Sequence, residues 1–269
     1  MATPIPEPVS YDSTRIKPLQ DRVAIVTGSS RGIGREIAIH LASLGALVVV
    51  NYTSSSSQAD SVVAQINSAA DSPPRAVAVK ADISNPDDVK SLFDSAEQAF
   101  DSEVQILVNS AGILDGTYPT VANTDVETFD KIFSVNTRGA FLCCREATNR
   151  VKRGGGGRIV LLTTSLVKAL RAGYATYTAS KAAVEAMVKI VAKELKGTGI
   201  TANCVAPGPI ATEMFYEGKS EELVEKLKND IPLGRLGEPN DVANLVGFLV
   251  SDGGEWVNGQ VIRVNGGFV

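Results

Sequence analysis

The sequence is poor in the residues that several common kinds of enzyme use. It has one histidine, His40, and three cysteines, Cys143, Cys144 and Cys204, none of which form a CxxC pair. A disulfide framework or a cysteine-rich metal site is therefore not expected, and histidine catalysis would have to rely on His40 alone. Since His40 lies inside a helical pattern, we predict that it is structural and that the chain holds no metal.

The chain also lacks an excess of charge of one sign and a long apolar run. Its 26 Lys and Arg against 30 Asp and Glu give a net charge of −4, which does not indicate binding to nucleic acid or to an anionic membrane. No apolar run approaches the ~20 residues of a membrane span. Residues 1–20 contain four prolines, Glu7 and Asp12, and they have neither an apolar signal core nor the acid-poor composition of a transit peptide. We therefore expect a disordered leader over residues 1–20 and a cytoplasmic location.

Short β-branched runs alternate with longer helical patterns along the rest of the chain. This alternation predicts a single α/β domain over residues 21–269, a doubly wound parallel sheet of the Rossmann type with helices on both faces. The expected strands are 23–27, 47–51, 76–80, 106–109, 158–163, 201–206 and 261–264, and most are apolar on both faces. Helices are expected over 33–44, 82–100, 126–153, 174–196, 220–229 and 240–249.

A glycine-rich turn follows the first expected strand and opens the first expected helix. Gly28 permits a tight turn, and Gly32 and Gly34 let the main chain approach a pyrophosphate at the helix N-terminus, where free N–H groups favour an anion. A strand, a glycine loop and a helix in this order predict a dinucleotide-binding site.

The end of the second expected strand points to the type of dinucleotide. An NAD site usually places Asp or Glu there for the ribose 2′-hydroxyl, but this chain has Asn51, Tyr52 and Thr53, followed by Ser54. Arg31, in the glycine loop, offers a guanidinium that is suited to a 2′-phosphate. The sequence therefore favours NADPH/NADP+ over NAD.

Tyr177 and Lys181 are spaced for one face of a helix. A nearby ammonium favours the phenolate form, so we expect the pKa of Tyr177 to be lowered from ~10 towards neutrality. A tyrosine of this kind is a plausible acid for a carbonyl oxygen that accepts a hydride.

Several motifs in this order and spacing resemble the short-chain dehydrogenase/reductase family over residues 20–269. They are Thr27-Gly-Ser-Ser-Arg-Gly-Ile-Gly34, Asn109-Ser-Ala-Gly112, Asn136, the Thr164/Ser165 pair, Tyr177 with Lys181, and Pro207-Gly-Pro209. Within the family, the segments 193–197 and 207–215 look like plant NADPH-dependent aldehyde reductase-like members. Other segments are similar to fungal trihydroxynaphthalene reductases.

The resemblance implies roles for individual residues. Tyr177 would donate a proton, Lys181 would hold the nicotinamide ribose, and Asn136 would anchor a water. The remaining cofactor contacts that we predict are Gly28, Ser30, Arg31, Gly32, Ile33, Gly34, Asn51, Tyr52, Thr53, Ser54, Asp82, Ile83, Asn109, Ala111, Gly112, Pro207, Gly208, Ile210 and Thr212. The function implied is NADPH-dependent reduction of aldehydes or ketones in small, mostly apolar substrates.

Spacing does not decide which hydroxyl polarises the carbonyl. Counting from Gly157 and back from Tyr177 favours Thr164, but Ser165 stands beside it and has the same donor and acceptor groups. The family's usual second asparagine is also replaced, by Ser110, and we expect little consequence because the turn is kept.

Two other functions remain open. One is a 3-oxoacyl-thioester ketoreductase acting on a carrier protein, for which Lys168 and Arg171 offer a weak basic patch. The other is a non-catalytic dinucleotide-binding protein of the same fold. We also expect a homotetramer or a homodimer, and a mobile lid over residues 212–230 whose apolar Met214, Phe215 and Tyr216 cover the substrate.

Overall fold

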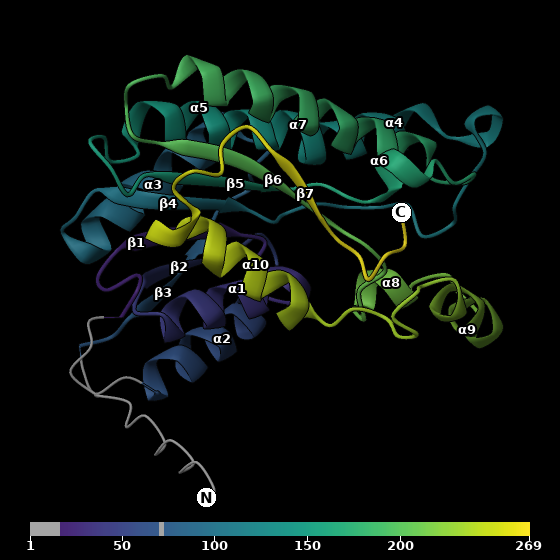
Figure 1. Ribbon diagram of the computed structural model, residues 1–269, viewed down its shortest axis with the longest axis horizontal. Helices are drawn as coiled ribbons and strands as arrows, with labels where there is room; N and C mark the ends of the chain where they lie inside the picture. Colours follow the sequence, from purple (N-terminus) through teal and green to yellow (C-terminus); the bar gives the residue numbers. More distant parts are fainter. Residues whose placement is uncertain (1–16, 70–72) are drawn as a thin grey trace, which may run out of the picture.

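The computed structural model describes residues 17–69 and 73–269, which form one parallel sheet between two layers of helices (Figure 1). The strand order is β3-β2-β1-β4-β5-β6-β7, which confirms the predicted doubly wound fold. The strands are β1 Val23–Thr27, β2 Leu47–Tyr52, β3 Ala76–Lys80, β4 Val104–Asn109, β5 Arg158–Leu162, β6 Thr201–Pro207 and β7 Val261–Val264. Helices α1 Gly32–Ser43, α2 Ser56–Ser68 and α10 Pro239–Val250 cover one face, and α3 Pro86–Phe100, α5 Ala140–Arg150 and α7 Ala175–Glu194 cover the other.

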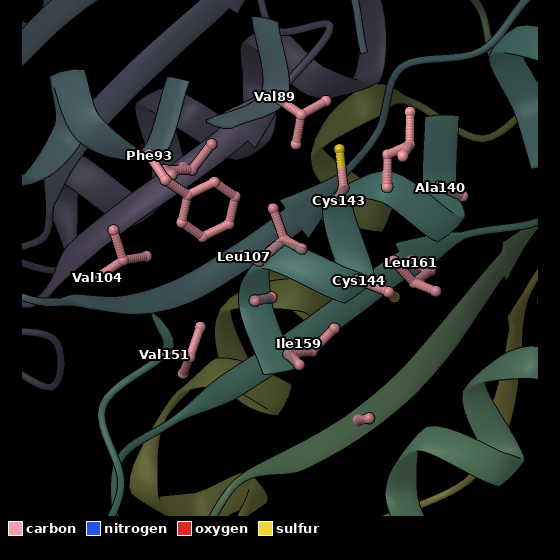
Figure 2. Packing of buried hydrophobic residues seen from close by; sticks show 14 of the residues in the cluster. Val89, Phe93, Val104, Leu107, Ala140, Cys143, Cys144, Val151, Ile159 and Leu161 are labelled. Carbon is pink, nitrogen blue, oxygen red and sulfur yellow. The ribbon is translucent and has the colours of Figure 1, made fainter. Parts of the chain in front are cut away.

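The two cores explain why the central strands are apolar on both faces. On the α3–α5 side, Phe93 and Cys143 pack over Leu107 and Ile159 of the sheet (Figure 2). Cys143, Cys144 and Cys204 are free and buried, and burial raises the pKa of each thiol. The cysteines therefore act as small core residues, as expected for a chain without a disulfide framework.

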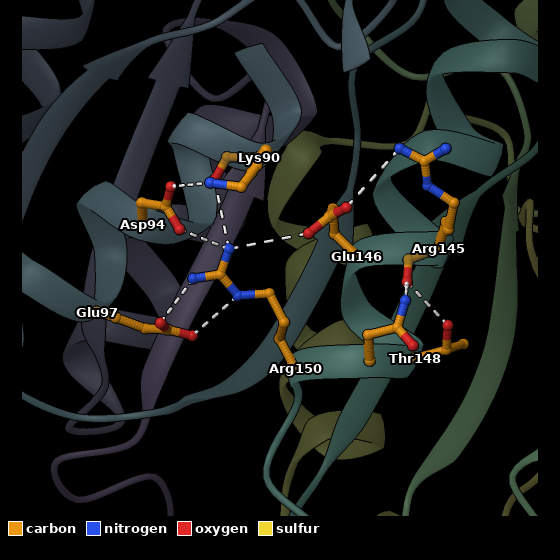
Figure 3. A network of polar contacts seen from close by, with 8 residues as sticks. Lys90, Asp94, Glu97, Arg145, Glu146, Thr148 and Arg150 are labelled. Atoms are coloured by element: carbon orange, nitrogen blue, oxygen red, sulfur yellow. Dashed lines mark hydrogen bonds and ion pairs between the residues drawn. The ribbon is translucent and has the colours of Figure 1, made fainter. Parts of the chain in front are cut away.

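Charged residues fasten α5 to α3 at the edge of this layer. Arg150, the last residue of α5, pairs with Asp94 at 2.7 Å and with Glu97 at 2.6 Å (Figure 3). Its guanidinium also lies 5.5 Å from the ring centre of Phe93. Arg150 therefore contacts both the acidic side chains of α3 and the aromatic ring of Phe93 in the apolar core.

Several predicted boundaries differ from the structure. The helix expected over 126–153 is divided into α4 Val126–Phe133, a π-helical segment Ser134–Gly139 and α5, because the hydrogen-bond spacing widens around Asn136. Helix α3 begins at Pro86 rather than at residue 82, because Asn85 caps it through the main-chain N–H groups of Asp87 and Asp88. Helix α2 was not predicted, since its serine-rich start has no regular apolar spacing.

The leader predicted over residues 1–20 lies largely outside the described residues, as does the absence of a targeting signal. The end of that range, however, belongs to the folded part. Leu19 is fully buried, and its main-chain N–H donates to the Leu44 carbonyl at 2.9 Å. Leu19 therefore packs as part of the folded domain.

His40 is a packing residue. It lies on α1, where its ring faces Gly247 of α10 so closely that a Cβ on this glycine would lie 2.5 Å from Nε2. Burial lowers the pKa of the imidazole. Across the described ranges, no group of three or more His, Cys, Asp or Glu is placed to hold a metal ion. In the same ranges, no helix has the length and apolar content of a membrane span.

Candidate active site

A cleft of about 670 Å³ opens where the carboxyl ends of the parallel strands meet. Ligand sites in doubly wound sheets form at this edge, because the loops after successive strands converge there. All the predicted catalytic and cofactor-binding residues line the cleft except Asn109 and Asn136. The fold thus brings the glycine loop and the Tyr177–Lys181 pair, about 150 residues apart in the chain, to one cavity.

The glycine loop has the geometry of an anion cradle. Gly28 has φ +60°, and a Cβ there would lie 2.7 Å from the Cα of Ala111. A Cβ on Gly34 would lie 2.4 Å from the Gly28 carbonyl oxygen, so both positions need glycine. Helix α1 begins after Arg31 without a side-chain cap, which leaves its first N–H groups to meet an anion. These features fit a dinucleotide pyrophosphate.

Asn51 and Asn109 support this loop from behind. The Asn51 amide accepts from the N–H of Gly28 at 3.1 Å and donates to the carbonyl of Ala81 at 3.0 Å. Asn109 is buried and accepts from the Thr27 hydroxyl, which in turn accepts from the Ala111 N–H. Their amides are therefore engaged with protein groups. Asn109 is not among the residues that line the cleft, and its contact with the adenosine ribose stays a prediction.

Among the residues that the structure describes, Arg31 is the only cation that lines the cleft near the end of β2. The other lining cations, Arg171, Lys181 and Lys219, come from the segments around the opposite end. The Arg31 guanidinium pairs with Glu213 of α8 Glu213–Tyr216 at 2.8 Å.

Thr164 and Ser165 follow β5 and differ in what they contact. The side chain of Thr164 lies beside the phenol of Tyr177, whose pKa it lowers, and its hydroxyl accepts from the N–H of Leu166 at 3.2 Å. Ser165 donates to the carbonyl of Ala206 at 3.0 Å and accepts from the amide of Asn265 at 3.1 Å. Ser165 is therefore tied to β6 and the C-terminal segment, and the hydroxyl beside Tyr177 belongs to Thr164.

The environment of Tyr177 differs from the expectation. Burial raises the pKa of Tyr177 to about 12, and the neighbouring Thr164 side chain offsets only part of that rise. Lys181 does not lower the phenol pKa here, because its ammonium donates to the carbonyl of Leu162 at 2.9 Å. The predicted shift towards neutrality is therefore wrong for this structure. Burial also lowers the pKa of Lys181 from 10.5 to about 8.

Asn136 lies behind the tyrosine helix. Its amide donates to the carbonyl of Ile113 at 2.9 Å and to the hydroxyl of Ser180 at 3.0 Å, and its oxygen accepts from the N–H of Ile113. Ser180 in turn donates to the carbonyl of Tyr177. Asn136 thus joins the loop after β4 to the catalytic turn of α7, and the π-helical segment aims its side chain at that junction.

The far end of the cleft is largely apolar. Met214, Phe215 and Leu227 line it from the predicted lid, which includes α8 and α9 Glu221–Asn229. Tyr216, by contrast, is 47% exposed and does not line the cleft. Figure 1 shows α8 and α9 beyond the end of the sheet, near the C-terminus.

Sequence reasoning missed Lys219. Its ammonium donates to the Tyr118 hydroxyl and to the Phe215 carbonyl, both at 2.5 Å, and fastens the lid to the loop after β4. Nothing in the local pattern marks these residues as partners, since Tyr118 and Lys219 are 101 positions apart.

Comparisons with known proteins agree with this site. A family model described as enoyl-(acyl carrier protein) reductase matches residues 28–269. Over 261 residues, the chain is 65% identical to an NADPH-dependent aldehyde reductase-like protein, chloroplastic, of Arabidopsis thaliana, covering 94% of this chain and 96% of the relative. It is 63% identical to NADPH-dependent aldehyde reductase 2, chloroplastic, of the same plant, covering 93% of this chain and 94% of the relative. The more distant resemblance to trihydroxynaphthalene reductases is also confirmed, at 38% identity to a member from Pestalotiopsis fici.

A solved structure shows the same fold with a cofactor bound. The short-chain dehydrogenase from Burkholderia cenocepacia in complex with NADP is 34% identical, with a TM-score of 0.85, and the match covers 93% of this chain and 99% of that one.

The predicted cytoplasmic location is wrong by these comparisons. Both Arabidopsis relatives are chloroplastic. The prediction relied on Glu7 and Asp12 to exclude a transit peptide, and both lie outside the described residues.

Proposed function

Because the chain belongs to the short-chain dehydrogenase/reductase family, we propose that it is an NADPH-dependent reductase of small, mostly apolar aldehydes and ketones. The single observation that carries this proposal is the shared cleft, which joins an anion cradle at one end to the hydroxyls of Tyr177 and Thr164 at the other. The Arabidopsis relatives of 63–65% identity, described as NADPH-dependent, support both the cofactor and the aldehyde class.

The bound nicotinamide would supply the hydride, and the protein's own groups would orient the carbonyl and provide the proton. Tyr177 is protonated at neutral pH because its pKa is about 12, so its phenol is an available acid. The phenol O–H breaks as the proton moves to the substrate oxygen. Thr164, whose side chain lies beside the phenol, polarises the same oxygen.

Lys181 and Asn136 would support the site around Tyr177 and Thr164. Lys181 is 3% exposed, and its ammonium lies 3.1 Å from where a Cβ on Gly112 would stand, so it borders the surface that a nicotinamide ribose would occupy. Asn136 holds the loop at Ile113 against α7. Arg31 would meet the 2′-phosphate, with Ser30, Thr53 and Ser54 beside it.

The two alternatives have less support. A carrier-protein ketoreductase needs a basic docking patch, but Arg171 is paired with Asp230 at 3.3 Å and stacked over Phe268. A non-catalytic protein has no need for an acid, a hydroxyl and an ammonium gathered at one apolar cavity.

We also propose a homotetramer in the chloroplast. Exposed apolar side chains occur on two separate surfaces, Phe129, Phe141 and Ile190 on α4, α5 and α7, and Phe248 and Trp256 at the C-terminal side. Two such surfaces are what a dimer of dimers requires. Light scattering measures the assembly, and a fluorescent fusion of the full chain in plant cells locates it.

Loss of NADPH absorbance tests the function with apolar aldehydes, ketones, sugars and acetoacetyl thioesters as substrates. We expect the highest kcat/KM with apolar aldehydes or ketones. Turnover of the thioester alone would support the ketoreductase, and NADPH binding without any turnover would support the non-catalytic protein.

A further inference from the structure

The glycine loop is connected to the lid by one ion pair. Arg31 immediately precedes α1, and Glu213 is the first residue of α8, so the 2.8 Å contact joins segments 182 residues apart. The side chains of Arg31 and Glu213 are 65% and 69% exposed, and both residues line the cleft. A ligand entering from solvent therefore meets both charges.

Besides the main-chain N–H groups of the glycine loop, the other side chains that line this end of the cleft carry no positive charge. Ser30, Thr53 and Ser54 offer neutral hydroxyls, and Asp82 is acidic. The favourable charge comes from Arg31 alone among the residues that line this end, and its NH1 already donates to Glu213.

We propose that Glu213 is a cofactor-selectivity residue, which competes with the 2′-phosphate of NADP(H) for the guanidinium of Arg31. This inference rests on the proposed function, since it takes the glycine loop as the cofactor site. A carboxylate and a phosphate seek the same N–H donors, so the phosphate has to displace Glu213 or share the guanidinium with it. NAD(H) has no 2′-phosphate and leaves the pair intact.

The size of the effect follows from the exposure of the pair. Exposed ion pairs are weak, because water and salt screen them. Removing the competing carboxylate should therefore tighten binding of a 2′-phosphorylated ligand by about two- to fivefold. Ligands without that phosphate should be unaffected.

The experiment measures dissociation constants for 2′,5′-ADP (adenosine 2′,5′-bisphosphate) and for 5′-AMP by calorimetry. These probes differ only in the 2′-phosphate and lack the nicotinamide, so the result does not depend on turnover. Glu213→Gln is compared with the wild type and with Glu221→Gln, which removes the same charge from the first turn of α9. We expect tighter binding of 2′,5′-ADP in Glu213→Gln alone and unchanged binding of 5′-AMP.

Unchanged or weaker binding of 2′,5′-ADP in Glu213→Gln would overturn the proposal, as would an equal gain in Glu221→Gln. A second arm repeats the measurement in the Arg31→Gln background. In that background, Glu213→Gln should leave the dissociation constant for 2′,5′-ADP unchanged. Tighter binding that persists without Arg31 would mean that the carboxylate repels the ligand directly and does not compete for the guanidinium. A protein that binds 2′,5′-ADP as expected but reduces no carbonyl would contradict the proposed function and leave this inference standing.

Discussion

The side chain of Thr164 lies beside the phenol of Tyr177, whereas the hydroxyl of the neighbouring Ser165 donates to the carbonyl of Ala206. The two adjacent residues carry the same hydroxyl group, but their different contacts give them different roles. The first prediction follows from this difference.

Thr164→Ala should lower kcat by about 10²- to 10³-fold, the usual loss when one donor to a developing oxyanion is removed. Ser165→Ala should cost much less, because its hydroxyl contacts the protein rather than the cleft chemistry. Thr164→Ser serves as the control and should keep most of the activity. Steady-state kinetics on both alanine variants decides the matter, and a more severe defect in Ser165→Ala would reverse the assignment.

Arg31→Gln should weaken NADPH binding and leave NADH binding nearly unchanged. The guanidinium contact with the 2′-phosphate is worth roughly 1.5–3 kcal/mol, or roughly a 10- to 150-fold preference for NADPH in the wild type. Fluorescence titration with each cofactor measures this preference. Equal dissociation constants for NADH and NADPH in the wild type would contradict the assignment of Arg31.

The stability of the cofactor-free protein should depend on pH through Lys181. Its pKa is about 8 in the folded state and 10.5 when exposed, so the unfolded chain binds the extra proton between these values. The free energy of unfolding therefore rises with pH between 8 and 10.5, by up to about 1.4 kcal/mol per pH unit, and falls again as pH is lowered to 8.

Urea denaturation of the wild type and of Lys181→Met between pH 7 and 10 isolates this effect. The free energy of unfolding of the wild type should rise relative to that of the variant above pH 8. A difference that stays constant over this range would mean that Lys181 does not titrate there.

Arg150→Ala should destabilise the protein by about 1–2 kcal/mol, because it leaves Asp94 and Glu97 without their shared cation. The matched control is Arg145→Ala on the same helix, whose contact with Glu146 is 3.8 Å and half-exposed (Figure 3). That variant should lose less than about 0.5 kcal/mol. Thermal unfolding measures both variants. Equal losses of unfolding free energy would show that Arg150 does not stabilise the contact between α3 and α5.

The sequence was sufficient to predict features that depend on local pattern. Gly28 and Gly34 occur in a strand–turn–helix context that has one common structural solution, so the loop and its cleft were foreseeable. The spacing of Tyr177 and Lys181 likewise places both on one helix turn.

Features that depend on distant neighbours were not predictable. The Arg31–Glu213 pair joins segments 182 residues apart, and no periodicity in either segment indicates the other. The pKa of Tyr177 rises because burial outweighs any nearby charge, and burial depends on the whole fold. The choice between Thr164 and Ser165 depended on how the chain turns from β5 into α6 Leu166–Ala169, which spacing does not encode.

The central claim is that this cleft binds NADPH and that Tyr177 delivers the proton to the carbonyl. The most direct test is Tyr177→Phe, which removes one hydroxyl and keeps the ring, with kcat for an apolar aldehyde and the dissociation constant for NADPH measured on the same preparation. We predict a loss of kcat of at least about 100-fold, or about 2.7 kcal/mol, with NADPH affinity within about threefold of the wild type. A variant that keeps more than about a tenth of the wild-type kcat, a loss below about 1.4 kcal/mol, would contradict the account.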